Sequence, residues 1–270
     1  MKKTIIALMA LAGVASAASV GYNSMTSAQK EGVAFAWDFA NGSVDLAVGS
    51  VTMGGSGWSS DNFTLTTNKT ATVGSQGTCP WSSQVSGMGT SFTLNIDVNS
   101  VSVYGTWDSI VSLYSNNAKS TFDHSMALTT NGDNDGTIVL QSGLGDETAY
   151  GNAGNQTLAT GLTADDINDT TFTIVSDADN KLLTLYVNGK QSAQVNNWGA
   201  GNGETLALTG FQFGSNFSNV DTIANAEVSN ITVWNKALTA KEVAALVPEP
   251  TTATLSLLAL AGLAARRRRK

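Results

Sequence analysis

Arginine is almost missing from this chain, because its four arginines all lie at positions 266–269, next to the C-terminus. Histidine and cysteine occur once each, as His124 and Cys79, and proline occurs three times in 270 residues. Without arginine, the chain before residue 266 cannot clamp a phosphate or carboxylate bidentately, which argues against a nucleic-acid partner and against sialidase chemistry. A lone cysteine cannot form an internal disulfide, and no spaced partners for a zinc or redox site accompany it.

Charge is sparse and mostly acidic. Charged residues make up 13% of the chain, with 14 basic and 21 acidic side chains. Without residues 1–17 and 248–270, the remaining chain keeps 7 basic and 20 acidic residues, a net charge of 7 minus 20, or −13. A basic-patch function is therefore excluded.

The first 17 residues have the order of a secretory signal peptide. Two lysines precede an apolar stretch, and Ala15 and Ala17 supply the small side chains that signal peptidase requires at its cleavage site. The sequence therefore predicts an exported protein whose mature chain starts at Ala18. The domain expected to fold outside the cell spans residues 18–247.

The C-terminus combines three features in order. Pro248, Glu249 and Pro250 precede an apolar stretch at about 251–265 and then five basic residues at 266–270. About 15 residues in a helix reach only about 22 Å, which is short for a hydrocarbon core of about 30 Å. The basic residues would stay in the cytoplasm and hold the chain in the membrane transiently during export. The two prolines keep the strip before the apolar stretch extended and open to an enzyme.

This order resembles the PEP-CTERM sorting signal of exported proteins in Gram-negative bacteria. The resemblance covers residues 248–270 and implies processing by an exosortase, with Pro248, Glu249 and Pro250 as the sorting motif. A plain C-terminal membrane anchor is the alternative interpretation. The localisation predicted is the cell envelope, its outer surface or the medium.

The region between the ends has the alternation of β-strands. Residues 92–98 place Phe92, Leu94, Ile96 and Val98 on one face and polar side chains on the other, which predicts a half-buried strand. Turn dipeptides such as Asn188-Gly189 separate the runs. Many short strands at this spacing predict an all-β sandwich. Similar runs occur at 33–39, 43–49, 109–115, 125–130, 137–143, 171–177, 182–189, 206–214 and 227–234.

Two other segments complete the predicted organisation. Residues 239–247 look helical, because Thr239 and Glu242 form a capping box before Val243 and Leu246. Residues 50–90 are rich in glycine and serine and predict a long loop or insertion instead of a second domain.

These residues resemble the LamG-like jelly rolls of the concanavalin A-like lectin and glucanase group. The similar stretches are AWDF at 36–39, the paired strands with their YVNGK turn at 171–194, and the closing strand and helix at 226–246. The resemblance implies a jelly-roll β-sandwich of two antiparallel sheets with one short C-terminal helix. Ser229 stands where the family usually has an acidic residue, so no role of that acid carries over to this chain.

A catalytic site is not apparent. Glucanases of this fold use two carboxylates on one strand, in a pattern such as Glu-x-Asp-x-x-Glu, and the sequence contains no such pattern. The pairs Asp165-Asp166 and Asp177 with Asp179 are interpreted as solvated surface or turn residues. His124 follows an aspartate but has no G-x-S-x-G elbow to support a triad.

A calcium loop is one candidate binding site. Asn131, Asp133 and Asp135 alternate before a glycine, as in oxygen-rich calcium loops, which suggests Ca²⁺ as a cofactor. Position twelve of such a loop would be Ser142 instead of glutamate, so a polar hairpin turn is the alternative.

Exposed aromatic rings are the other candidate for binding. Trp58, Trp81 and Trp198 lie among small and polar residues in predicted loops, where a ring can either stack on a sugar or pin its loop to the sandwich. Trp37 and Trp234 lie in strand patterns and are predicted to be core residues.

Two functions follow as hypotheses. The first is a non-enzymatic jelly-roll protein at the cell envelope that binds a glycan, exopolysaccharide or other matrix polymer. The second is a carbohydrate-active enzyme, a glycoside hydrolase or lyase, whose carboxylates the sequence does not reveal. Signal peptidase and an exosortase are the processing partners in either case.

Overall fold

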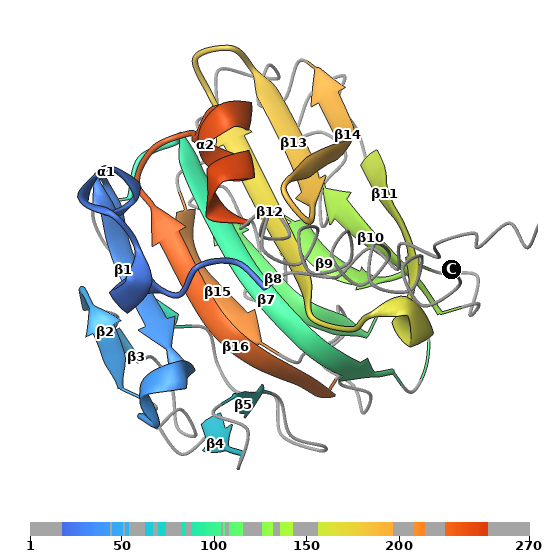
Figure 1. The fold of residues 1–270 in the computed structure, drawn as a ribbon. Helices are drawn as coiled ribbons and strands as arrows, with labels where there is room; N and C mark the ends of the chain where they lie inside the picture. Colours follow the sequence, from blue (N-terminus) through green and yellow to red (C-terminus); the bar gives the residue numbers. More distant parts are fainter. Residues whose placement is uncertain are drawn as a thin grey trace, which may run out of the picture.

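The computed structural model describes most of the predicted domain (Figure 1). The described residues are 18–43, 45–50, 52–53, 63–66, 70–73, 83–84, 88–103, 105, 108–115, 126–131, 136–142, 156–196, 208–213 and 225–247. Within these ranges, no helix is both long and apolar enough to cross a membrane.

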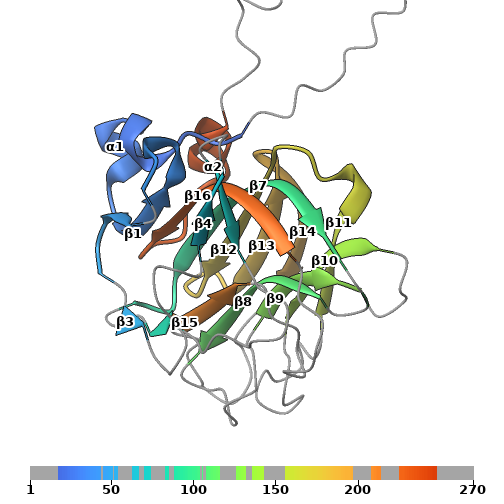
Figure 2. The same cartoon turned by 90° about the horizontal axis from the view of Figure 1, so that it is seen from below.

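The described strands form two antiparallel sheets that pack face to face, which confirms the predicted jelly-roll β-sandwich (Figures 1 and 2). The larger sheet follows the order β14 (Lys190–Asn196), β13 (Leu182–Val187), β12 (Thr170–Asp177), β7 (Phe92–Ser102), β16 (Asn225–Trp234), β1 (Val33–Asp38) and β2 (Leu46–Val48). Two short strands, β4 (Phe63–Leu65) and β5 (Ala71–Val73), extend it where β5 pairs with β16.

The second sheet follows the order β11 (Gln156–Thr163), β10 (Thr137–Ser142), β9 (Met126–Thr130), β8 (Ser109–Ser115), β15 (Leu208–Phe213), β6 (Ser83–Gln84) and β3 (Thr52–Met53). Each of the ten runs predicted from alternation overlaps one of the described strands, although β7, β12 and β16 extend beyond their runs. The sequence pattern missed β11 and β14. It also missed the four short strands β3 to β6, which lie in the segment 50–90 that was predicted to be a long loop.

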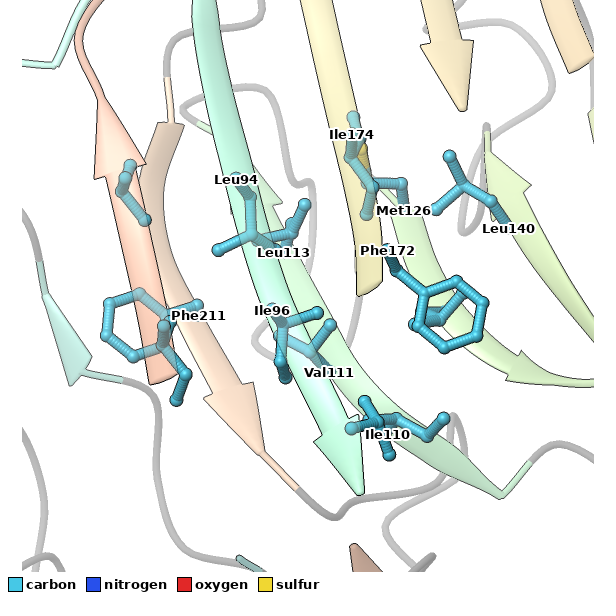
Figure 3. Packing of buried hydrophobic residues seen from close by; sticks show 14 of the residues in the cluster. Leu94, Ile96, Ile110, Val111, Leu113, Met126, Leu140, Phe172, Ile174 and Phe211 are labelled. Carbon is cyan, nitrogen blue, oxygen red and sulfur yellow. The ribbon is translucent and has the colours of Figure 1, made fainter. Parts of the chain in front are cut away.

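The core lies between the sheets because alternate side chains of each strand point inward. Figure 3 shows Leu94 and Ile96 of β7 beside Val111 and Leu113 of β8, all of them buried. An aromatic group joins the sheets near β1. The ring of Phe211 on β15 stacks on Phe35 at 5.4 Å between centroids, and it meets Trp37 edge-on at 5.7 Å. The core position predicted for Trp37 is therefore confirmed.

The hairpin predicted at Asn188-Gly189 joins β13 to β14. Both residues have positive φ, 50° at Asn188 and 73° at Gly189, as a type I′ turn requires. The predicted C-terminal helix is also present as α2 (Ala240–Leu246), and its capping box is complete, with Thr239 accepting from the Glu242 amide. The described residues also form four shorter helical segments that were not predicted: α1 (Ser27–Lys30), η1 (Tyr22–Ser24), η2 (Phe39–Asn41) and η5 (Ala164–Asp166).

A smaller cluster holds α1 and α2 against the outer face of the larger sheet. Trp234 is fully buried there with Val243 and Leu246, and its ring nitrogen donates to the carbonyl of Gln29 at 2.8 Å. The predicted burial of Trp234 is confirmed, although its ring lies outside the main core.

The polar face of β7 is not exposed as the sequence pattern predicted. Thr93, Asn95 and Asp97 are each fully buried. The prediction was wrong because residues 18–25, here called the N-terminal strap, cross this face in front of β16 and β7 and contact Asn95 and Asp97 (Figure 1). The hydroxyl of Thr93 is instead bonded to the backbone of Lys236 and Leu238, which follow β16. The Val20 amide donates to the carbonyl of Leu246 at 2.8 Å and so joins the strap to the end of α2.

Candidate functional site

The outer face of the smaller sheet carries small and polar side chains. An irregularity in β8 turns Ile110 and Val111 both into the core, so the residues on either side of this pair point outward. The outward side chains on β8, β9 and β10 are called the hydroxyl floor. They are Ser109, Ser112, Ala127, Thr129, Val139 and Gln141.

The strand register arranges these side chains in two rows. Ser109 lies beside Thr129, which lies beside Val139 on the next strand. Neighbouring strands are about 4.8 Å apart, so hydroxyls in adjacent positions have the spacing at which one small polar molecule can contact both.

Three hydroxyls of the floor have no hydrogen-bond partner among the described residues: those of Ser109, Ser112 and Thr129. All three side chains are 0% exposed. A buried hydroxyl without a partner costs about 1–3 kcal/mol, and each hydroxyl can both donate and accept. The floor therefore favours a neutral, hydrogen-bonding partner such as a sugar hydroxyl or water.

The described part of the floor contains no charged side chain. The side-chain amide of Gln141, which belongs to the floor, already has one partner, because its Oε1 accepts a hydrogen bond from the Thr157 hydroxyl at 2.9 Å. Acid–base hydrolysis of a glycoside needs two carboxyl groups about 5–10 Å apart, and the described floor supplies neither.

A second polar cluster lies on the opposite side of the molecule, beneath the N-terminal strap. Strand pairing places Asp38, Asn230, Asp97 and Thr171 in one row across β1, β16, β7 and β12. The next row contains Thr232, Asn95 and Thr173. We call Asp97 and the side chains linked to it by hydrogen bonds the Asp97 network. Ser19, Thr171 and Asn230 bond to Asp97 directly, and Asn95 and Thr173 are linked to it through Ser19.

Asp97 is the centre of this network. Its Oδ1 accepts from the Thr171 hydroxyl at 2.7 Å, and its Oδ2 accepts from the Ser19 hydroxyl at 2.9 Å and from the Asn230 side-chain amide. Asn95 donates to the Ser19 hydroxyl at 2.7 Å and so ties the strap to β7. Burial raises the pKa of Asp97, an effect that the hydrogen bonds from Thr171, Ser19 and Asn230 oppose.

Asp38 holds the other end of the strap. Its Oδ2 accepts from the backbone amide of Asn23 at 2.9 Å and from the Asn23 side chain at 3.1 Å. The strap passes so close that a Cβ on Gly21 would lie 2.9 Å from the same oxygen. The two aspartates thus fix the strap to the sheet, and these contacts give both of them a structural role.

The structure describes few of the binding residues predicted from the sequence. Asn131 follows β9, and its backbone amide donates to the carbonyl of Thr137 at 2.9 Å, as in the start of a hairpin turn. The other two predicted calcium ligands, Asp133 and Asp135, lie outside the described residues, so calcium stays a prediction. Within the described ranges, no group of three or more His, Cys, Asp and Glu residues is placed to hold a metal ion.

Several other predicted residues also lie outside the described part. They are Ala15, Ala17, Trp58, Cys79, Trp81, His124, Trp198, Pro248, Glu249 and Pro250.

The aspartate pairs interpreted as surface or turn residues are described. Asp166 caps η5, and hydrogen bonds from the backbone and hydroxyl of Thr163 lower the pKa of this exposed carboxyl. Asp177 accepts from the backbone amide of Asn180 at 3.0 Å in the turn before β13. Both carboxylates stabilise local chain reversals.

Sequence reasoning missed both polar clusters. The alternation in 109–115 and 126–130 identifies Ser112 and Thr129 as outward, but nothing in it shows that these side chains are buried. The Asp97 network joins Ser19 to residues more than 70 positions away, and no local pattern reports such contacts.

Comparison with known proteins supports the interpretation of the C-terminus. Residues 246–270 match the model of the PEP-CTERM protein-sorting motif, which confirms the predicted sorting signal and implies an exported protein. No curated protein matches the chain.

Several solved structures are similar in fold. Domain 4 of AbnA, an extracellular GH43 arabinanase from Geobacillus stearothermophilus solved with arabinotriose, has a TM-score of 0.48 and 14% identity, covering 80% of this chain and 98% of that one. The heptameric SAP-like pentraxin from Limulus polyphemus has a TM-score of 0.42 and 15% identity, with 63% and 77% covered. The CBM40 of the Ruminococcus gnavus IT-sialidase, bound to α2,3-sialyllactose, has a TM-score of 0.41 and 16% identity, with 60% and 84% covered. Similarity this low assigns no ligand or activity, and it does not confirm the LamG-like resemblance.

Proposed function

We propose that this chain is an exported, exosortase-sorted LamG-like jelly-roll protein that binds a neutral glycan or exopolysaccharide at the cell envelope without cleaving it. The hydroxyl floor is the proposed contact region, and because its three hydroxyls are 0% exposed, a ligand would reach them only by displacing the atoms that cover them. The observation that carries this proposal is a set of three buried hydroxyls, on Ser109, Ser112 and Thr129, that have no hydrogen-bond partner in the described part of the chain and lie on one face of the smaller sheet.

The chemistry of the floor supports a neutral polymer. Sugar hydroxyls both donate and accept, so they can satisfy serine and threonine side chains without any charge. The predicted mature domain has no arginine and a net charge of −13, which disfavours acidic polysaccharides through repulsion. A site that hydrogen-bonds a ligand hydroxyl also rejects analogues without it, because buried polar groups are then left unpaired.

A pair of matched variants tests the floor. Thr129→Val removes a hydroxyl of the floor. Thr232→Val removes an equally buried hydroxyl from the opposite side of the sandwich, which likewise has no partner among the residues that the structure describes. The exported protein is purified in both forms and run through gels that contain neutral or acidic polysaccharides, with and without calcium. We expect a neutral polysaccharide to retard the native protein and the Thr232→Val variant, and to retard Thr129→Val less.

Equal retardation of both variants would remove the floor from the proposal. A lack of retardation by every polymer would reject glycan binding as a whole. Retardation that requires calcium would instead support the predicted loop at Asn131, Asp133 and Asp135 as the ligand site.

Exosortase processing has a separate test. Pro248, Glu249 and Pro250 are proposed to mark the cleavage region, so the mature protein should lack the apolar stretch and the basic residues after it. Mass spectrometry of the protein from envelope and medium should find no peptide that runs through Leu263 into Arg266. Such a peptide in the surface-located form would support the plain membrane anchor.

A further inference from the structure

Asp97 is a buried carboxylate without a cationic partner among the described residues. Its four hydrogen-bonding groups, on Thr171, Ser19 and Asn230, are all neutral. A buried carboxylate is normally paired with a cation, since desolvation disfavours its ionised form. The other titratable group in the same row is Asp38, which is also acidic and so cannot supply the missing charge.

The N-terminal strap brings one backbone nitrogen very close to this carboxylate. The Ser19 side chain is 7% exposed, and both its hydroxyl and its backbone N–H donate to Asp97. Ala18 directly precedes Ser19 in the chain, so its nitrogen is one residue away from the groups that contact this carboxylate. An opposite charge within about 4–6 Å of a carboxylate favours its ionised form.

Signal peptidase changes the chemistry of that nitrogen. Before cleavage after Ala17, the nitrogen of Ala18 is a neutral amide, and after cleavage it is an α-ammonium group with an ordinary pKa of about 7.7–8.0. We propose that removal of the signal peptide supplies the missing cation, and that the new α-ammonium group of Ala18 pairs with Asp97 and locks the N-terminal strap onto the larger sheet.

The proposal makes export and folding depend on each other. A chain that still carries its signal peptide buries Asp97 with neutral partners only, and its strap is held less firmly. The mature chain gains a charge pair that forms only after the chain has crossed the membrane. The inference uses the export part of the proposed function and is independent of glycan binding.

An insertion variant of the full chain tests the pairing. Inserting Gly-Ser between Ala17 and Ala18 keeps the signal peptide, Ser19 and every described contact, but moves the new ammonium group two residues away from Asp97. Asp97→Asn provides the second arm, because its amide oxygen still accepts from Ser19 while the Thr171 hydroxyl can turn to accept from the amide nitrogen. N-terminal sequencing of each purified mature protein establishes where cleavage occurred.

Four proteins are compared: the native chain, the insertion variant, Asp97→Asn and the chain with both changes. Their melting temperatures give the coupling between the ammonium group and the Asp97 carboxylate. We expect the insertion to lower the melting temperature of the native chain at pH 6–7 and to leave that of the Asp97→Asn chain nearly unchanged. Each pKa unit by which the ammonium group lowers the pKa of Asp97 corresponds to a tenfold change in the unfolding equilibrium. Equal shifts in both backgrounds, or none in either, would overturn the proposal.

The pH dependence has a definite sign. Burial alone raises the pKa of Asp97, so the insertion variant should lose stability as pH rises above the ordinary range of aspartate, near pH 4. The paired ammonium group opposes that loss in the native protein. The difference in melting temperature should therefore widen as pH rises above about 4 and close below about pH 3, where Asp97 is protonated in both states.

A measurement on the native protein covers the case in which Asp97→Asn does not fold. At pH 7.5, a free α-amine reacts with acylating reagents faster than lysine does, because its pKa is lower. Pairing with Asp97 raises the amine pKa, so the α-amine of the native protein should react more slowly than that of the insertion variant, with the exposed Lys190 and Lys241 as internal references. Peptide mass spectrometry measures both rates, and equal rates for the two α-amines would contradict the pairing.

If sequencing shows that the mature chain does not start at Ala18, the predicted cleavage site is wrong and the pairing fails with it. The glycan-binding proposal would be unaffected by that result.

Discussion

Replacement of a buried threonine by valine should destabilise this fold where the hydroxyl has a hydrogen-bond partner and stabilise it where the hydroxyl has none. Thr129 and Thr232 are both fully buried with hydroxyls that have no partner among the described residues. Thr171 is also fully buried, but its hydroxyl donates to Asp97 Oδ1 at 2.7 Å. Valine has nearly the same shape as threonine, so the change tests the hydroxyl alone.

The magnitudes follow from the hydrogen bonds. Thr171→Val removes a bond to a buried carboxyl group and leaves Asp97 Oδ1 without that donor, at a cost of about 1.5–3 kcal/mol. A domain of this size shifts its melting temperature by about 2–4 °C per kcal/mol, so we expect a decrease of about 3–12 °C. Thr129→Val and Thr232→Val each remove an unsatisfied group and should raise the melting temperature by up to a similar amount in ligand-free protein.

Differential scanning calorimetry of the purified mature proteins measures these shifts. Circular dichroism at 25 °C confirms that each variant keeps the native strand content. A decrease at Thr129 as large as that at Thr171 would mean that the Thr129 hydroxyl has a strong partner in the free protein, and the description of the floor as unsatisfied would be wrong.

Three other substitutions test separate parts of the fold. Phe211→Ala should destabilise the protein by about 3–5 kcal/mol in urea unfolding, because it empties the site between two rings at 5.4 and 5.7 Å, and a loss under 1 kcal/mol would argue against that packing. Gly21→Ala should cost about 1–3 kcal/mol by pushing the strap off Asp38, and unchanged thermal stability would contradict the close approach. Thr239→Ala should cost about 1 kcal/mol at pH 7. The backbone amide of residue 239, which alanine keeps, is the main cause of the lowered pKa of Glu242, and the Thr239 hydroxyl adds a hydrogen bond to the same carboxylate at 2.8 Å. The part of the difference that comes from this hydroxyl should shrink as pH falls through the pKa of Glu242, and a difference that grows in acid would refute the cap.

The main features of the fold were predictable from local patterns in the sequence. Alternation located the long strands, Asn188-Gly189 located a hairpin, and Thr239 with Glu242 located the start of α2. In each case the physical cause acts over a few residues: the two-residue period of a strand, the positive φ of a tight turn, or the orphan amides of a helix end.

The elements that were missed depend on contacts far apart in the chain. The outward face of β7 is predicted to be solvated because its side chains are polar, yet the N-terminal strap covers Asn95 and Asp97, and the residues after β16 hydrogen-bond to Thr93. β14 was missed because its exposed side chains, such as Gln191 and Gln194, give little apolar alternation. Local patterns reveal the polarity of a face, whereas the covering segment is set by tertiary packing.

The candidate site was predictable only in part. Sequence reasoning pointed to loop tryptophans and a calcium loop, most of which lie outside the described residues. It did not point to Ser109, Ser112 and Thr129, because single hydroxyls in a serine- and threonine-rich chain carry no signal of their own. Their significance comes from the register of β8 and β9 and from the lack of partners in the described structure.

The central claim is that the mature protein binds a neutral glycan and leaves it intact. The most direct measurement incubates the purified exported protein with the polysaccharide that retards it and follows both the bound fraction and the number of reducing ends with time. We expect a constant bound fraction and no increase in reducing ends, with or without calcium. A steady increase in reducing ends that scales with protein concentration would contradict the claim and show that the domain is a carbohydrate-active enzyme.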